Sequence, residues 1–357
     1  MYATKGFPRV GLTAAGFRSR LVLLGTAGGS AYYPDQWRRG VASAVVVGDA
    51  AYLIDCGEGV GVRYRQAGLG PAGFAHGLDN LRAIFFTHLH SDHTVGYPEL
   101  VVAGFLNGLR FRTDPIQVYG PGRRTSAGTL LGDVPSGVLV NPENPMPGTT
   151  DLTRSVLAAY ATDLNERALR YERPVNPEAS FSVHDIPLPP GTGDDPNGDP
   201  APKMEPFAVY HDPNVRVTAT LVDHRPCFPT FGFRFETPDG AIVFSGDTRR
   251  NDNLIRLAQG ADVLVHEVMS RAALERQLTE LWWRGRIDAI MGYHTTVEEV
   301  DQVAAAANVK TLVLSPISPP NATDEELWPH RRFSGQIIVG QDLDQIGVGE
   351  KGSSPDA

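Results

Sequence analysis

The sequence is poor in cysteine, in long apolar runs and in clustered positive charge. It has only two cysteines among 357 residues, Cys56 and Cys227, which excludes a disulfide framework and fits a reducing compartment. No apolar run approaches the ~18 residues that span a bilayer, and no apolar segment of a secretory signal follows the first charged residues. We therefore expect a cytoplasmic protein with no membrane partner.

Positive charge is also scarce. Lys and Arg total 32 against 41 Asp and Glu, which gives a formal net charge of −9. Nucleic-acid partners usually require a basic face, and the longest runs of Lys or Arg here are pairs such as Arg249-Arg250 and Arg331-Arg332. The composition therefore predicts no nucleic-acid partner.

The sequence does contain many short apolar segments that alternate with helical patterns. Apolar residues make up 41% of the chain, enough for a sizeable core. Strands are predicted at 20–25, 42–47, 50–54, 81–86, 116–119, 215–222, 230–236, 241–245, 263–266, 311–314 and 336–339, and an amphipathic helix at 151–172. The order of strands and helices favours a layered α/β sandwich over a regular parallel βαβ series.

The strongest chemical signal is the segment His88-Leu89-His90-Ser91-Asp92-His93. Four potential metal ligands lie within six residues, in a loop that directly follows a predicted strand. Imidazole and carboxylate ligands together suit zinc, iron or manganese. Such clustering is improbable by chance in a chain with 10 histidines. We therefore predict a metal site at this loop.

Together with other motifs, this segment resembles the metallo-β-lactamase-fold hydrolases, and within them the tRNase Z-like and arylsulfatase-like branch. The motifs that carry the resemblance are Leu24–Gly29, Ile54–Gly59, His88–His93, Val118–Gly122, Asp223-His224, Phe244–Thr248, Val265–Glu267 and Tyr293–Thr296. The resemblance implies an αββα sandwich of the α/β class as a single domain over residues 20–346. Residues 1–19 would form an N-terminal extension and residues 347–357 a flexible tail.

The same resemblance implies a set of metal ligands. Those of the first metal are His88, His90 and His224, those of the second are Asp92 and His93, and Asp247 bridges the two. Asp55 is implied to orient the metal loop by a hydrogen bond to an imidazole.

The catalytic residues that the resemblance implies are Asp92, His294 and Glu267. His294 corresponds to a histidine that gives a proton to the departing oxygen, a task that suits an imidazolium. Glu267 would orient His294 by a hydrogen bond.

One position departs from the family pattern. The strand 311–314 leads into Ser315-Pro316, and Pro316 stands where the last histidine ligand of the second metal belongs. Three interpretations remain open at this stage. The second site is empty or weak, another residue such as His294, Cys227 or His330 replaces the histidine, or substrate and water complete the site.

The extra length of the chain lies between His93 and His224. We expect an insertion at about 121–214 that places a helical lid over the metal cleft. His224 and Asp247 are only 23 residues apart (247 − 224), which leaves no room between them for an RNA-gripping arm. With the acidic charge, this favours a small-molecule substrate over tRNA.

These observations lead to one main hypothesis and two alternatives. A bound zinc ion lowers the pKa of its water from ~15.7 to about 7 and makes hydroxide available at neutral pH. The main hypothesis is a hydrolase of a small-molecule ester, lactone, sulfate ester or phosphodiester, with one or two zinc ions and with iron or manganese as other candidates. The alternatives are a mononuclear iron oxygenase that uses His88, His224 and Asp247, and a non-catalytic ligand-binding homologue. A homodimer is a further expectation from the family.

Overall fold

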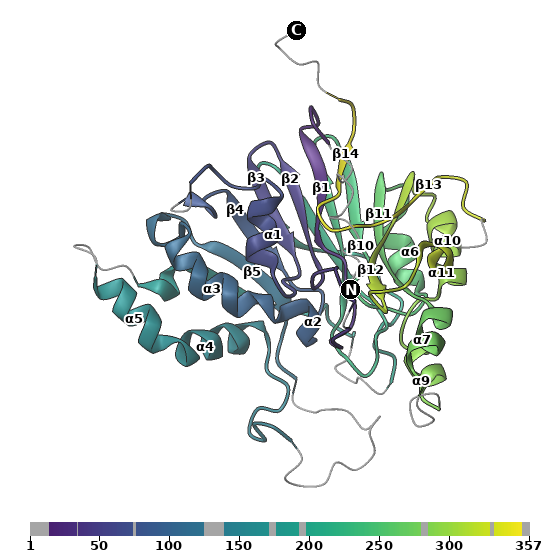
Figure 1. Cartoon of the computed structure of the whole chain (residues 1–357), viewed down its shortest axis with the longest axis horizontal. Coiled ribbons are helices and arrows are strands. Elements are labelled where there is room, and N and C mark those ends of the chain that lie inside the picture. The colour runs from purple at the N-terminus through teal and green to yellow at the C-terminus, as the bar shows by residue number, and fades with distance from the viewer. Residues whose placement is uncertain are drawn as a thin grey trace, which may run out of the picture.

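Two mixed β-sheets lie face to face, with helices on the outer side of each (Figure 1). The computed structural model describes residues 14–33, 35–73, 76–124, 139–170, 176–192, 198–279, 285–328 and 332–351. Within them, one sheet has the strand order β14-β1-β2-β3-β4-β5-β6 and the other the order β13-β12-β11-β10-β9-β8-β7. This is the αββα sandwich of the α/β class that the resemblance implied.

Strands inside each sheet are mostly buried, whereas β6, β7, β13 and β14, at the edges of the two sheets, are only partly buried. Those of the first sheet are β1 Ser19–Gly25, β2 Ala42–Val47, β3 Ala50–Ile54, β4 Leu81–Phe85, β5 Ile116–Pro121, β6 Phe181–Ile186 and β14 Gln345–Val348. Those of the second are β7 Phe207–His211, β8 Arg216–Leu221, β9 Phe231–Thr237, β10 Gly240–Phe244, β11 Val263–Met269, β12 Thr311–Ser318 and β13 Gln336–Val339. β2, β3 and β11 are buried along their full length, as expected for strands covered on both faces.

The helices form the two outer layers. Those in the first half of the chain are α1 Val60–Gln66, α2 Ser91–Thr94, α3 Gly96–Leu106, α4 Thr149–Ala159 and α5 Ala161–Leu169. Those in the second half are α6 Asp252–Leu257, α7 Arg271–Gln277, α9 Ile287–Met291, α10 Val297–Ala306 and α11 Asp324–Leu327. Within the described part of the chain, no helix has both the length and the apolar character to cross a membrane.

The core has three apolar layers, as a four-layer sandwich requires. The central layer lies between the sheets and is centred on Phe85, whose ring packs within 5.2–5.7 Å of the rings of Tyr119, Tyr210, Phe233 and Phe235. A second layer joins the first sheet to α1, α3 and α4, and a third joins the second sheet to α6 and α10.

Parallel strands bring the predicted site residues to one edge of the sandwich. β4 is parallel to β3, and β10 and β12 are both parallel to β11. Because parallel strands end at the same edge, the loops after β3, β4, β10 and β11 all open there. The metal loop and its partner motifs therefore meet although they lie far apart in the sequence.

The segment predicted to form a helical lid lies in the outer layer beside the first sheet. The amphipathic segment forms two helices, α4 and α5, separated at Tyr160, and α4 contacts α3, β5 and β6. Val156 packs into the layer that contains Tyr97, and Leu164 packs against Phe105. The apolar residues of α4 and α5 thus pack in the outer layer of the first sheet, and Figure 1 shows both helices beside α3.

Two predicted boundaries also change. The flexible tail was expected from residue 347, but β14 includes Gly347 and Val348, which pair with Arg20 and Ser19 of β1. The insertion at 121–214 contains β6 and β7, the last strands of the two sheets, so much of it belongs to the sandwich. Residues 1–13, 125–138, 171–175, 193–197 and 352–357 lie outside the described residues.

Candidate metal centre

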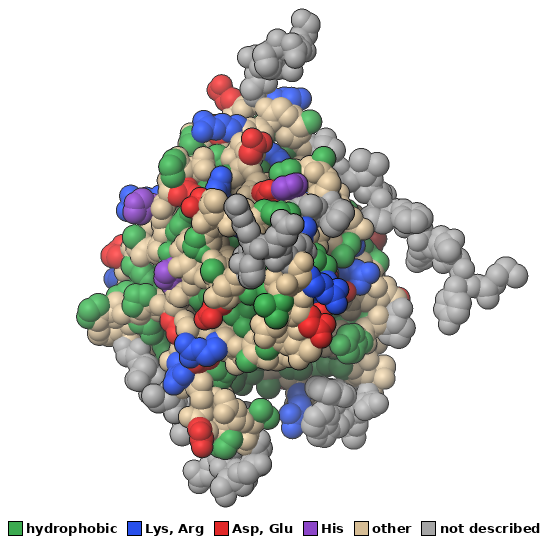
Figure 2. Space-filling view, turned by 90° about the vertical axis from the view of Figure 1, so that its left-hand side faces the viewer, with side chains coloured by type: hydrophobic (Ala, Val, Ile, Leu, Met, Phe, Trp, Pro, Cys, Tyr) green, Lys and Arg blue, Asp and Glu red, His purple; other side chains and the backbone are tan. Residues whose placement is uncertain are grey.

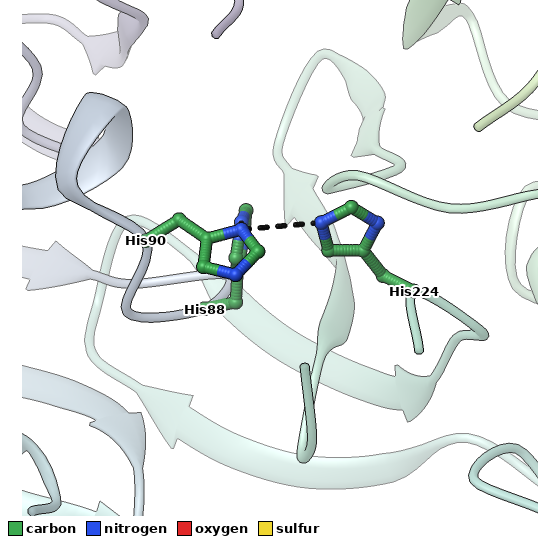
Figure 3. A group of neighbouring side chains, drawn as sticks. All are labelled: His88, His90 and His224. Atoms are coloured by element: carbon green, nitrogen blue, oxygen red, sulfur yellow. Dashed lines mark hydrogen bonds between the residues drawn. The ribbon is translucent and has the colours of Figure 1, made fainter. Parts of the chain in front are cut away.

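Five histidine and aspartate side chains converge at the open edge of the sandwich, with a sixth, His294, beside them. Among the described residues, three groups place one ligand atom of each member within 4.8 Å of the others. The groups are His88–His90–His224, His88–His93–Asp247 and His224–Asp247–His294. Figure 3 shows the first group, in which His90 Nδ1 lies 3.0 Å from His88 Nε2 and 3.2 Å from His224 Nε2. The structure therefore brings together most of the predicted ligands.

The ring orientation of His224 suits metal binding through one nitrogen. Its Nδ1 lies 3.0 Å from the backbone carbonyl oxygen of Tyr293. Since a carbonyl only accepts, Nδ1 donates and Nε2 keeps its lone pair toward the cluster. Burial lowers the pKa of His224 to about 4, which keeps the imidazole in its neutral, metal-binding form.

Asp55 orients His93 in the same manner. The carboxylate accepts hydrogen bonds from His93 Nδ1 at 2.8 Å, from the backbone N–H of Thr87 at 2.8 Å and from its hydroxyl at 2.9 Å. Asp55 adopts a left-handed backbone conformation with φ 59°, a strained geometry that proteins retain at functional sites. One carboxylate thereby ties the end of β3 to the start of the metal loop.

Two glycines allow the metal loop to pack against the turn after β3. A Cβ at Gly57 would lie 2.6 Å from the carbonyl oxygen of Asp92, and a Cβ at Gly96 would collide with the carbonyl oxygen of Gly57. The backbone of Cys56 instead hydrogen-bonds with His93 and Gly96, at 2.7 and 2.9 Å. This close backbone approach fixes the position of α2, which carries Asp92 and His93.

The donor set fits a divalent cation. His93 Nε2 and Asp247 Oδ1 are buried, lie 3.3 Å apart and have no hydrogen-bond partner among the described residues. Unpaired buried polar atoms are costly unless they bind something. Burial alone would raise the pKa of Asp247, but the surrounding histidines, above all His93, bring it well below its usual value. Imidazole nitrogens around an ionised carboxylate form an N/O donor set of the type that binds zinc and related metals.

Asp92 lies at the rim of the cluster. Its Oδ2 accepts a hydrogen bond from the backbone N–H of Gly29 at 2.8 Å, and its Oδ1 accepts one from Ser30 Oγ at 3.2 Å. Oδ2 also lies 3.6 Å from His93 Nε2. Asp92 is thus adjacent to the second donor set, although none of the three ligand groups includes it.

Glu267 and His294 form a buried pair next to Asp247. His294 Nδ1 lies 2.9 and 3.1 Å from the two carboxylate oxygens of Glu267, and Glu267 also accepts the backbone N–H of Thr248 at 2.6 Å. Burial opposes protonation of His294, but the charge and the hydrogen bond of Glu267 raise its pKa. The predicted orienting role of Glu267 is compatible with this geometry, and Nε2 of His294 is left for the substrate side.

Pro316 lies close to His93 in the structure. It lines a small cavity of about 20 Å³ together with His93, Asp55 and Ser315. Ser315 Oγ is buried and has no partner among the described residues. Proline has no side-chain donor, so the donor set around His93 lacks the ligand that the family pattern places there.

Of the candidate substitutes for that ligand that the structure describes, His294 is the one grouped with Asp247. Their side chains approach to 3.9 Å, from His294 Nδ1 to Asp247 Oδ2. Cys227 belongs to none of the three ligand groups. His330 lies outside the described residues.

Two cavities border the cluster. One, of about 650 Å³, has His90, Asp92, His224 and Asp247 in its wall, and its other side is apolar, with Met269, Leu274, Leu278, Ile290 and Tyr293. The other, of about 880 Å³, is polar and contains Lys203, Arg225, Arg249, Arg250 and Arg256. His294 and Arg225 line both. The sequence analysis did not predict either group of wall residues. The Arg249-Arg250 pair, close to Asp247 in the sequence, was the one signal that could have indicated the polar cavity.

Comparisons with known proteins agree with this architecture. Residues 36–220 match the metallo-beta-lactamase superfamily, and residues 159–315 match the beta-lactamase superfamily domain. The crystal structure of human tRNase Z, short form, has a TM-score of 0.56 at 21% identity, over 92% of this chain and 99% of that chain. The zinc-bound structure of PqqB from Methylobacterium extorquens has a TM-score of 0.52 at 13% identity, over 92% of this chain and 100% of that chain.

Two curated relatives are considerably more similar in sequence. Both are named Ribonuclease Z, one from Mycobacterium sp. (strain KMS) and one from Mycobacterium bovis (strain BCG / Pasteur 1173P2). They are 32% and 31% identical to this chain over 332 residues, which cover 92% of it and 95% and 98% of the relatives.

The chain belongs to the metallo-β-lactamase superfamily, a class of metal-dependent hydrolases. Within that class, the two curated relatives described above are named Ribonuclease Z. The predicted family and the prediction of a hydrolase are therefore confirmed. The fold is one that binds divalent metal ions, and the His/Asp groups described above agree with it.

The predicted substrate and partner are wrong. Ribonuclease relatives contradict a small-molecule substrate and the expectation of no nucleic-acid partner, and they set aside the oxygenase and non-catalytic alternatives. The charge argument failed because it used the average of the whole chain, whereas nucleic-acid binding depends on where the cations gather. On the face in Figure 2, charges of both signs are interspersed, while five cationic side chains line the cavity beside His294.

Proposed function

We propose that this protein is a metal-dependent ribonuclease that hydrolyses a phosphodiester bond in precursor tRNA. The observation that carries the proposal is the junction of the His88–His90–His224 cluster with Asp247 and the Glu267–His294 pair, in a chain 32% identical to proteins named Ribonuclease Z. This arrangement provides metal ligands and a separate proton donor at one cavity. Those are the two functions that phosphodiester hydrolysis needs.

We assign the metal ligands as His88, His90, His93, His224 and Asp247, with Asp92 at the rim of the site and Asp55 as the residue that orients His93. The orphaned buried atoms of His93 and Asp247 support this assignment. These residues would hold a divalent ion, with zinc as our first choice, which would supply an activated water and offset negative charge on the phosphoryl oxygens.

His294 is the residue we assign to the leaving group. Its Nδ1 donates to Glu267, so Nε2 is the nitrogen that faces substrate. The buried carboxylate favours the imidazolium form, and an imidazolium can transfer its Nε2 proton to the departing oxygen of the RNA. Glu267 stabilises the charged ring and sets its tautomer.

The apolar cavity suits a base of an RNA strand, and the polar cavity suits its phosphate backbone. The apolar wall with Leu274, Ile290 and Tyr293 provides contact area for an unpaired base beside the cluster. RNA-binding sites commonly receive unstacked bases on aromatic and apolar side chains. The polar cavity offers cations for the backbone.

The test is cleavage of a defined RNA by the full chain, loaded with zinc or manganese. The substrate is a tRNA transcript with extra nucleotides at both ends, and the comparison is the mature tRNA. We expect cleavage of the extended transcript at one junction, and loss of at least about 10³-fold of the rate in His88→Ala, because catalysis by the metal is removed.

A small diester provides the control for the chemistry. Hydrolysis of bis(p-nitrophenyl) phosphate together with no cleavage of any RNA would contradict the assigned substrate while leaving the metal centre intact. Full activity of His88→Ala on RNA would contradict the assigned centre.

A further inference from the structure

We infer that the polar cavity beside His294 is a subsite for backbone phosphates of the RNA next to the scissile bond. The inference rests on the proposed function and extends it by naming the side chains that hold the strand. It is based on the charges of the cavity, their pairing and its connection to the cluster.

The cavity is more cationic than the chain as a whole. Five cationic side chains line it, Lys203, Arg225, Arg249, Arg250 and Arg256, against four carboxylates, Asp199, Asp223, Asp252 and Glu299. The whole chain has 32 Lys and Arg against 41 Asp and Glu. A concave site with excess positive charge concentrates anionic ligands. The local balance is thus the reverse of the overall one.

One carboxylate holds two of the guanidinium groups in place. Arg225 donates to both oxygens of Asp223, at 3.0 and 2.6 Å, and Arg249 Nε lies 3.5 Å from the same carboxylate. Burial disfavours the charged form of Asp223, but the two arginines together lower its pKa. Since one negative charge is shared by two positive ones, the trio keeps a net positive charge in a fixed geometry. Preorganised arginines are well suited to phosphate oxygens.

Two further cations are free for a ligand. Arg250 and Lys203 are exposed, and neither forms a hydrogen bond or an ion pair with another residue of the described ranges. Arg250 is three residues after Asp247 in the sequence, on the loop between β10 and α6. Binding a phosphate would therefore break no hydrogen bond or ion pair between these cations and other described residues, so they are the residues to vary.

The cavity is continuous with the catalytic edge. His294 and Arg225 line both this cavity and the one that contains His90, His224 and Asp247. An RNA strand whose scissile phosphate lies at the cluster can therefore extend past His294 into the polar cavity. The leaving-group proton donor and the phosphate subsite are thus on the same side of the scissile bond.

The experiment compares Arg250→Ala and Lys203→Ala with Arg154→Ala in the metal-loaded full chain. Arg154 is exposed on α4, lines none of the cavities described above and serves as the matched control. With the extended tRNA transcript, we expect KM to rise about five- to tenfold for Arg250→Ala, with a smaller change in kcat, because ground-state and transition-state binding are lost together. Arg250→Glu should have a larger effect.

Salt dependence separates a phosphate contact from a general loss of structure. Removing one contact to a single-stranded phosphate reduces the slope of log binding constant against log salt concentration by about 0.7. We expect this reduction for Arg250→Ala and not for Arg154→Ala, in fluorescence anisotropy titrations with the labelled transcript. Unchanged metal content confirms an intact site in each variant.

Identical KM values and salt slopes in all three alanine variants would overturn the inference. If Arg250→Ala shows the expected reduction in salt slope but the wild-type chain never cleaves the transcript, the proposed function is overturned and the phosphate subsite is retained. The two results are thus distinguishable.

Discussion

Asp55 Oδ2 accepts a hydrogen bond from His93 Nδ1 at 2.8 Å, so the Nε2 of His93 is the nitrogen that faces Asp247. The two residues are 38 positions apart, one at the end of β3 and the other in α2. We predict that Asp55→Ala weakens metal affinity by about 10- to 100-fold, the usual effect of losing such an orienting partner. Competition with a fluorescent chelator measures it.

The control for this variant is Asp49→Asn, in the exposed turn between β2 and β3. It should bind metal like the wild type. Equal affinities for Asp55→Ala and the wild type would show that the hydrogen bond does not orient the ligand.

Variants of the Glu267–His294 pair distinguish a loss of proton donation from a loss of metal binding. His294→Ala should lower kcat for the extended transcript by about 10²- to 10⁴-fold, the range of general acid catalysis, while the metal content stays unchanged. Glu267→Gln should have a smaller effect on kcat, because a neutral partner can still hydrogen-bond the ring but no longer favours its charged form.

Metal content, measured by elemental analysis, decides between two roles of His294. The ring of His294 lies in one ligand group with His224 and Asp247. If His294→Ala loses metal in parallel with activity, the residue is a ligand that replaces the histidine missing at Pro316, and its assignment as proton donor is wrong.

Pro316→His should increase the number of divalent ions bound per chain. The position borders the same small cavity as His93 and Asp55, and an imidazole there would join the unpartnered atoms His93 Nε2 and Asp247 Oδ1. Pro316→Ala is the matched control, since it removes the proline without adding a donor. Equal stoichiometry in wild type, Pro316→Ala and Pro316→His would mean that the backbone at β12 does not present a side chain to this cavity.

Substitutions of Phe85 test the packing between the two sheets independently of the metal site. Its ring is fully buried between the sheets among four aromatic neighbours. Phe85→Ala should lower the free energy of unfolding by about 3–5 kcal/mol through lost burial and a residual cavity. Phe85→Leu should cost less because it keeps most of the volume. Urea unfolding measures both, and a loss below 1 kcal/mol for Phe85→Ala would contradict the assigned packing.

The sequence predicted those strands and turns whose pattern lies within a few consecutive residues. The hairpin of β2 and β3 has the predicted bounds, because its apolar runs are separated by the turn at Gly48, whose φ of 57° suits glycine. The end of β12 was not predicted. The strand continues to Ser318 through Pro316, where proline normally marks a strand boundary.

Long-range features depended on pairing that no local pattern contains. Gly347 and Val348 were expected in a flexible tail because the segment from residue 347 onward is mostly polar, yet they pair with the first strand. The amphipathic pattern of α4 and α5 is compatible both with a lid over the site and with a helix packed in the outer layer. Only the contact of Val156 and Leu164 with α3 and its neighbours decides between the two.

The sequence by itself determined the candidate ligands and the family, because His88, His90, Asp92 and His93 lie within one short loop and need no folding to be recognised as a group. The tertiary structure alone decided which nitrogen of His93 and His224 faces the cluster and which cations surround His294. Net charge is a sum over the chain, whereas attraction between charges depends on distance and burial. An acidic protein can therefore present a cationic cavity once folding gathers Lys203, Arg225 and Arg250 in one place.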